Sequence, residues 1–128
     1  MKNLKNYWLF NKPVAHRGLW GGNIVENSLT AYKAAADNGY PIEIDLFLTT
    51  DGEIVCFHDD TLTRMTGASG KITDKSLAEL KALSLNGTAE KIPTLKEVLD
   101  VKRSFRRLPW QNSPAYRDKR PAERLYRR

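Results

Sequence analysis

The segment that constrains the fold most is PIEIDLFL at residues 41–48, in which apolar and mostly acidic side chains alternate. A period of two residues predicts a β-strand, with the Ile and Leu side chains on one face and Glu43, Asp45 and Phe47 on the other. We expect the Ile and Leu face to pack under helices, so that the two carboxylates point into an interior. Carboxylates that share a buried face repel each other unless a cation lies between them. The segment therefore predicts a strand with a site for Mg²⁺ or Ca²⁺, cations that prefer oxygen ligands.

A strand, a loop and a helix are predicted ahead of this segment. The residues PVAHRG at 13–18 indicate a short buried strand that ends at His16, and a glycine-rich loop follows. Asn27 is expected as the N-cap of an alanine-rich helix over residues 28–38, because its side chain can accept a hydrogen bond from the first turn.

A hairpin is predicted after the alternating strand, because the turn pair Asp51-Gly52 is followed by the strand-like residues EIVCF. If Asp51 and Gly52 alone form the loop, Thr50 pairs with Glu53, and the two residue numbers of every cross-strand pair add up to 103. Asp45 would then lie opposite His58, and Glu43 opposite Asp60. Cross-strand partners share a face, so His58 would join the carboxylates beside the metal. A longer loop would shift this register by one residue and turn His58 away.

Two capping boxes predict the starts of two further helices. Ser76 with Glu79 precedes a stripe of leucines, and Thr94 with Glu97 precedes LKEVLDV. Cys56 is the only cysteine of the chain and lies in the apolar run IVCF, where we expect it to be a small buried apolar residue.

The composition changes abruptly after Val101. Residues 1–101 carry 11 Lys and Arg against 13 Asp and Glu, whereas residues 102–128 carry 10 against 2. The second segment also has three prolines and no sustained period, so we expect a basic, disordered tail. The break suggests a shifted reading frame or a truncated gene product. Nucleic-acid binding through the tail, with stacking on Trp110, Tyr116 and Tyr126, is the disfavoured alternative.

The apolar runs exclude two classes of protein. They are far shorter than the roughly 20 residues of a membrane span. The N-terminal residues lack the apolar core of a secretory signal. We therefore expect a soluble cytoplasmic chain without a membrane span.

Taken together, the motifs resemble the N-terminal half of the glycerophosphodiester phosphodiesterase family. The resemblance covers roughly residues 13–100, through AHRG, ENSLTAYKAAADNG, EIDLFLTTDGEIVCFHDDTLTRMTGASG and IPTLKEVLD. Each of HRG, ExD and HD alone is a weak signal, but their combination at these spacings is highly specific. The resemblance implies an α/β fold, the truncated N-terminal part of a (β/α)8 TIM barrel of the phospholipase C-like phosphodiesterase type. It also implies a partial barrel domain over 1–101 with an insertion at about 61–91.

The resemblance further implies a set of site residues. His16 and His58 match the family's catalytic histidines, Arg17 the residue that engages the substrate phosphate, and Glu43 and Asp45 two ligands of a divalent metal, Mg²⁺ or Ca²⁺. Such groups suit phosphodiester hydrolysis, which needs charge stabilisation on the phosphate oxygens and two proton transfers. Glu26 also matches a family position, and we weigh a supporting role for it equally against an exposed place ahead of the helix.

The reaction implied is hydrolysis of a small-molecule glycerophosphodiester to glycerol 3-phosphate and an alcohol, through attack by a glycerol hydroxyl and a cyclic phosphate. After residue 101 the family would continue with a strand carrying ExK, and this chain has KRSFRRLPWQNSP instead. The third carboxylate and the lysine are therefore absent at that place. The alternative is a non-enzymatic barrel fragment that binds anions or nucleic acid weakly through its basic tail. A dimer or higher oligomer could cover the open edge of a partial barrel.

Overall fold

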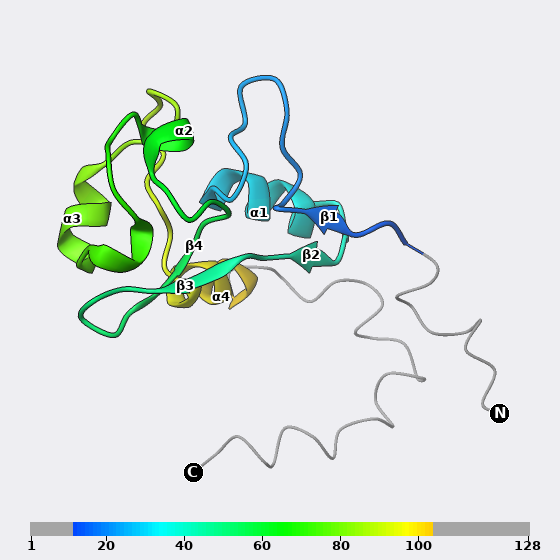
Figure 1. The fold of residues 1–128 in the computed structure, drawn as a ribbon. Helices are drawn as coiled ribbons and strands as arrows, with labels where there is room; N and C mark the ends of the chain where they lie inside the picture. Colours follow the sequence, from blue (N-terminus) through cyan, green and yellow to red (C-terminus); the bar gives the residue numbers. More distant parts are fainter. Residues whose placement is uncertain (1–11, 104–128) are drawn as a thin grey trace, which may run out of the picture.

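The computed structural model describes residues 12–103, which form short strands flanked by helices (Figure 1). Figure 1 shows α2 and α3 gathered at one end of this segment, away from β1 and β2. The elements in chain order are β1 (Ala15–His16), α1 (Leu29–Asp37), β2 (Ile42–Glu43), β3 (Leu46–Leu48), β4 (Ile54–Cys56), α2 (Thr63–Thr66), the 3-10 helix η3 (Ile72–Asp74), α3 (Leu77–Ala82) and α4 (Leu95–Arg103).

Strands β1 and β2 pair in parallel, and α1 makes the connection between them. The register sets Ala15 beside Ile42 and His16 beside Glu43. Because parallel strands end at the same edge of a sheet, this pairing brings the last residues of both strands together. The predicted order of strand, helix and strand is confirmed.

Helix α1 begins one residue later than predicted. Its N-cap is Ser28, whose hydroxyl accepts a hydrogen bond from the backbone N–H of Ala31 at 3.1 Å. Asn27 was the predicted cap, and this prediction is wrong because Asn27 adopts a left-handed backbone conformation with φ of 52°. Its side-chain oxygen instead accepts a hydrogen bond of 2.6 Å from the hydroxyl of Tyr32.

The hairpin of β3 and β4 has a register that differs by one residue from the prediction. Leu46 pairs with Cys56 and Leu48 with Ile54, so paired numbers sum to 102. The turn holds three residues, because the Thr49 hydroxyl accepts a hydrogen bond from the Glu53 N–H at 2.9 Å and Gly52 adopts a left-handed φ of 84°.

This register corrects the predicted partners of the site residues. The backbone oxygen of Asp45 accepts a hydrogen bond from Phe57 at 3.1 Å, so Asp45 lies opposite Phe57 and not opposite His58. The predicted pairing of Glu43 with Asp60 is wrong for the same reason. His58 therefore lies in the segment that follows β4, beyond the paired residues.

The alternating segment 41–48 is interrupted, since β2 ends at Glu43 and β3 begins at Leu46. Ile42 and Ile44 pack against the buried cluster of Tyr32, Cys56 and Val98, as the alternation predicted. The prediction fails further along, because the side chains of Leu46 and Leu48 are 46% and 59% exposed.

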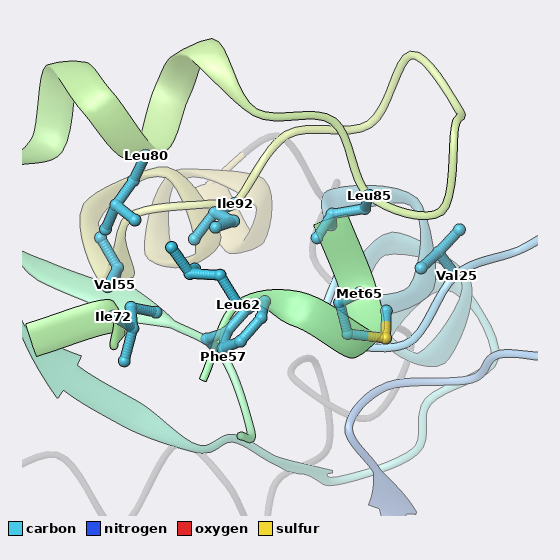
Figure 2. Close-up of a cluster of buried hydrophobic side chains, with 9 residues drawn as sticks. All are labelled: Val25, Val55, Phe57, Leu62, Met65, Ile72, Leu80, Leu85 and Ile92. Atoms are coloured by element: carbon cyan, nitrogen blue, oxygen red, sulfur yellow. The ribbon is translucent and has the colours of Figure 1, made fainter. Parts of the chain in front are cut away.

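The main core lies between the hairpin and the segment that carries α2, η3 and α3 (Figure 2). Its buried members are Val25, Val55, Phe57, Leu62, Met65, Ile72, Leu80, Leu85 and Ile92. The leucine stripe predicted for α3 contributes Leu80 to this cluster, with Leu77 and Leu83 packed against it.

Both predicted capping boxes are present. In α3 the Ser76 hydroxyl accepts from the Glu79 N–H, and the Glu79 carboxylate accepts from the Ser76 N–H at 2.8 Å. At the start of α4 the Thr94 hydroxyl and the Glu97 carboxylate make the same reciprocal pair. Cys56 is buried as expected, and burial raises the pKa of its thiol to about 12.

The tail predicted for residues 102–128 lies, apart from the last two residues of α4, outside the described residues. Within residues 12–103, none of the helices has the length and apolar character that crossing a bilayer needs.

Gly18 lies two residues after β1 and packs against α1, which gives a test of this arrangement. Its φ is 86°, and a Cβ built on it would lie 2.8 Å from the backbone carbon of Ala31 in α1. Gly18→Ala should therefore lower the free energy of unfolding by about 3 kcal/mol, from backbone strain plus overpacking. Urea denaturation measures this difference.

Gly22→Ala is the matched control, because Gly22 also has a positive φ, of 57°, but nothing lies within 4 Å of its Cβ position. In the control variant the free energy of unfolding should fall by about 1 kcal/mol, because only the backbone conformation is unfavourable for alanine there. Equal losses in both variants would contradict the close approach of α1 to Gly18.

Candidate active site

The candidate site begins where β1 and β2 end together. His16 lies beside Glu43 in the parallel register and has an exposed side chain. Its backbone oxygen accepts a hydrogen bond of 2.8 Å from the indole of Trp20. The next residue, Arg17, adopts a left-handed φ of 61°, a conformation that a residue with a Cβ rarely takes outside functional sites and turns.

Two backbone contacts hold Arg17 in this conformation. Its N–H donates to the Glu43 carboxylate at 3.2 Å, and its carbonyl oxygen accepts from the Asn27 N–H at 2.9 Å. Glu43 of β2 therefore positions the backbone that follows β1, and the loop ahead of α1 closes over the same residue.

The guanidinium of Arg17 lies between two more carboxylates. Its Nη1 donates to Glu26 Oε1 at 3.2 Å, and its Nε lies 3.7 Å from Asp45 Oδ2. The second distance is too long for a hydrogen bond. Arg17 Nε and Asp45 Oδ2 are both buried and lack a hydrogen-bond partner within the described structure. A buried donor and a buried acceptor without partners mark a place where a ligand could satisfy both.

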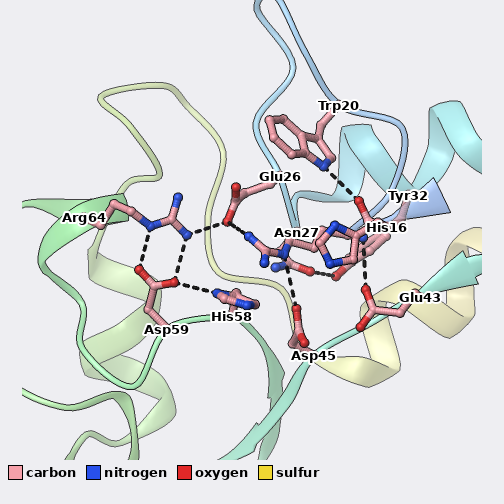
Figure 3. A network of polar contacts seen from close by, with 11 residues as sticks. His16, Trp20, Glu26, Asn27, Tyr32, Glu43, Asp45, His58, Asp59 and Arg64 are labelled. Atoms are coloured by element: carbon pink, nitrogen blue, oxygen red, sulfur yellow. Dashed lines mark hydrogen bonds and ion pairs between the residues drawn. The ribbon is translucent and has the colours of Figure 1, made fainter.

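His58 is oriented by its neighbour along the chain. Its Nδ1 lies 2.7 Å from Asp59 Oδ1 (Figure 3). The hydrogen bonds from Arg64 lower the pKa of Asp59 well below its ordinary value, with a further contribution from His58. An ionised carboxylate only accepts hydrogen bonds, so Nδ1 of His58 is the donor in this contact, and in a neutral imidazole Nε2 is then the nitrogen that can accept a proton.

Arg64 joins the two parts of the network and was not singled out from the sequence. Its guanidinium donates to both Asp59 oxygens, at 2.6 and 2.9 Å, and to Glu26 Oε1 at 2.6 Å. Figure 3 shows the guanidinium between these two acidic residues. Arg64 lies 38 residues from Glu26 in sequence, so no local pattern connects them. The available signal was its place five residues after Asp59, inside the family-like segment.

Glu26 is buried, with 7% of its surface exposed, so the alternative that placed it on the surface is wrong. Burial alone would raise the pKa of its carboxyl. The hydrogen bond and charge of Arg64, with those of Arg17, outweigh burial and hold the pKa below its ordinary value. Glu26 is therefore an ionised acceptor shared by two arginines.

The network has an excess of negative charge. The guanidinium groups of Arg17 and Arg64 contact the carboxylates of Glu26, Asp59 and Asp45, and the backbone N–H of Arg17 contacts that of Glu43. Four formal negative charges against two positive ones leave two negative charges. Within residues 12–103 there is no cluster of three or more His, Cys, Asp or Glu side chains that could hold a metal. Glu43 and Asp45 supply two carboxylates, and a divalent cation such as Mg²⁺ often takes only one or two while it fills its shell with water and substrate phosphate. Asp45 Oδ2 accepts no hydrogen bond within residues 12–103 and lies 3.7 Å from Arg17 Nε.

The comparisons with known proteins identify the family of this chain. The sequence matches the model of the glycerophosphoryl diester phosphodiesterase family over residues 16–117. The matched range extends beyond Val101. The domain boundary that the change of charge predicts after this residue stays a prediction. The chain is 39% identical over 95 residues to a glycerophosphodiester phosphodiesterase of Caldanaerobacter subterraneus, covering 69% of this chain and 39% of that protein. It is 32% identical to human lysophospholipase D GDPD1, covering 76% and 35%.

Among solved structures, a phosphodiesterase of Oleispira antarctica in complex with its product sn-glycerol-3-phosphate matches with a TM-score of 0.64 and 40% identity. The match covers 70% of this chain and 39% of that one. The chain thus spans about two fifths of the length of these relatives. The structural neighbours are TIM-barrel enzymes, and the described residues correspond to the N-terminal portion of that fold. The chain belongs to the glycerophosphoryl diester phosphodiesterase family.

Proposed function

We propose that this chain supplies the N-terminal half of a metal-dependent site that hydrolyses glycerophosphodiesters to glycerol 3-phosphate and an alcohol. The observation that carries the proposal is the continuous series of polar contacts from His58 through Asp59, Arg64 and Glu26 to Arg17. The glycerophosphodiesterase names of the relatives support the reaction, and the bound product of the Oleispira antarctica neighbour supports glycerol 3-phosphate as its product.

Phosphate binding is assigned to Arg17. Among residues 12–103 its Nε has no hydrogen-bond partner and lies 3.7 Å from Asp45 Oδ2, so it can donate to a non-bridging phosphate oxygen without breaking a hydrogen bond found there. Glu26 fixes the other side of the guanidinium at 3.2 Å and limits its rotation. A divalent cation held by Glu43 and Asp45 would supply charge stabilisation on the phosphate oxygens.

Proton transfer is assigned to the two histidines. His58 presents Nε2 as the acceptor for the proton of the attacking hydroxyl, because Nδ1 donates to Asp59. The ionised Asp59 then stabilises the imidazolium that forms. His16, beside Glu43, is the second histidine and gives a proton to the leaving alcohol oxygen. A glycerol hydroxyl as nucleophile leads to a cyclic phosphate, which water opens to glycerol 3-phosphate.

A divalent cation, Mg²⁺ or Ca²⁺, and a role in lipid and glycerol metabolism belong to the same proposal, and both rest on the family resemblance. The cytoplasmic location stays a prediction from the sequence.

The activity test is release of glycerol 3-phosphate from glycerophosphocholine by the purified folded chain, with Mg²⁺, with Ca²⁺ and with a chelator. We expect turnover with a divalent cation only. His58→Gln should lower kcat by about 10² to 10⁴-fold, the usual contribution of general acid–base catalysis. His16→Gln should have an effect of similar size.

Lys71→Gln is the control, because Lys71 is exposed and lies outside the polar network. It should keep the rate of the unsubstituted chain. Unchanged turnover in both histidine variants would overturn the residue assignment, and no turnover from a folded sample with either cation would overturn the proposed activity of this chain.

Metal binding is tested separately by thermal unfolding. Mg²⁺ at about a hundred times its Kd should raise the Tm of the chain by roughly 10 °C, because a cation that binds the folded site more tightly than the unfolded chain stabilises the folded state. Asp45→Asn should abolish this shift, since it removes the negative charge of a carboxylate that would hold the cation.

Asp74→Asn removes an exposed carboxylate from the same chain and should leave the shift intact. An equal Mg²⁺ shift in Asp45→Asn and Asp74→Asn would place metal binding elsewhere.

A further inference from the structure

We propose that Arg64 is a positioning residue that holds both halves of the candidate site at once, orienting His58 through Asp59 and Arg17 through Glu26. The inference rests on the proposed function for the roles of His58 and Arg17. Its geometric content is tested without turnover on His58, whose tautomer reports the contact from Arg64 through Asp59.

The first arm runs from Arg64 to His58. Arg64 Nε donates to Asp59 Oδ2 at 2.6 Å and Nη2 to Oδ1 at 2.9 Å, so the carboxylate is held by two bonds in one plane. The same Oδ1 accepts from His58 Nδ1 at 2.7 Å. Because Asp59 is held, its oxygen has a fixed direction, and the imidazole of His58 takes its orientation and its tautomer from that direction.

The second arm runs from Arg64 to Arg17. Nη2 of Arg64 donates to Glu26 Oε1 at 2.6 Å, and the same oxygen accepts from Arg17 Nη1 at 3.2 Å. The Glu26 side chain is 8% exposed, so its charge has little water to interact with. Without Arg64, Glu26 would keep only Arg17 as a cationic partner among the ion pairs of residues 12–103, and it would draw the guanidinium away from the phosphate position.

The fork of the guanidinium explains why an arginine serves at this position. A single planar group with several N–H donors reaches two oxygens of Asp59 and one of Glu26, which a lysine ammonium cannot do in the same geometry. The Arg64 side chain is 48% exposed, so its substitution should leave the buried core in place. The Arg64–Asp59 pair is partly exposed and contributes little to stability, and the buried Glu26 keeps its contact with Arg17 when Arg64 is replaced. The consequence of the substitution is therefore expected in the site more than in the fold.

The test is NMR of the imidazole nitrogens, since the chain has only two histidines. In the unsubstituted chain at neutral pH, neutral His58 should be protonated mainly on Nδ1, the nitrogen that faces Asp59. In Arg64→Gln, Asp59 is released, and the ratio of the Nδ1-protonated to the Nε2-protonated form should fall about five-fold, as for the loss of one ordinary hydrogen bond. Arg64→Lys should restore the ratio only in part.

Two internal controls accompany this measurement. The signals of His16, which has no contact with Arg64 among the hydrogen bonds and ion pairs found for residues 12–103, should not change. Lys71→Gln, which removes a positive charge from an exposed position seven residues away in sequence, should leave both histidines unchanged. An unchanged His58 tautomer ratio in folded Arg64→Gln, or in folded Arg64→Lys if the first variant does not fold, would overturn the proposal.

A double substitution tests whether Arg64 acts through Asp59. Asp59→Asn alone should alter the His58 ratio, and adding Arg64→Gln should produce no further change. Additive effects would show that Arg64 reaches His58 by another route and would contradict the proposal. A chain that shows the tautomer response but no diesterase turnover would refute the proposed function and leave this inference standing. Turnover without a change of the His58 tautomer ratio in Arg64→Gln would overturn this inference and leave the proposed function standing.

Discussion

The backbone N–H and the guanidinium of Arg17 contact the carboxylates of Glu43, Glu26 and Asp45 at distances of 3.2, 3.2 and 3.7 Å. These three acidic residues come from β2, from the loop ahead of α1, and from the break between β2 and β3. Without a cation among them they would repel one another at this spacing. Arg17 is therefore the point at which the first strand, the first loop and the second strand meet, and its left-handed backbone is the strained conformation that makes the three contacts compatible.

The segment of α2 and the loop before it extends this arrangement to His58. Arg64 of α2 reaches Glu26 and Asp59, and α2 is held in place by the burial of Met65 and Leu62 in the main core. Packing of apolar side chains thus sets the position of a charged side chain on the same short helix. Apolar burial determines where α2 lies, and the fork of the guanidinium determines which carboxylates it joins.

Much of this structure could be predicted from sequence because the signals are local. The two capping boxes, the burial of Cys56 and the strand, helix and strand order depend on residues close together in the chain. The hairpin register could not be predicted, because the Thr49 side chain stabilises a three-residue turn over the two-residue turn that Asp51-Gly52 favours. Arg64 was missed because its partner Glu26 is distant in sequence. The structure links His58 to Arg17 through Asp59, Arg64 and Glu26. The predicted link, a cross-strand pair of Asp45 with His58, does not form.

The central claim is that the described residues form a cation-dependent phosphate site around Arg17, although the chain spans about two fifths of its relatives. Isothermal titration of the folded chain with sn-glycerol 3-phosphate, in Mg²⁺ and in chelator, tests this most directly, because binding requires the site but not the complete catalytic machinery. We predict binding in Mg²⁺ that is lost in chelator and in Arg17→Gln. Equal affinity in all three samples, or no binding to a folded chain in Mg²⁺, would contradict the account.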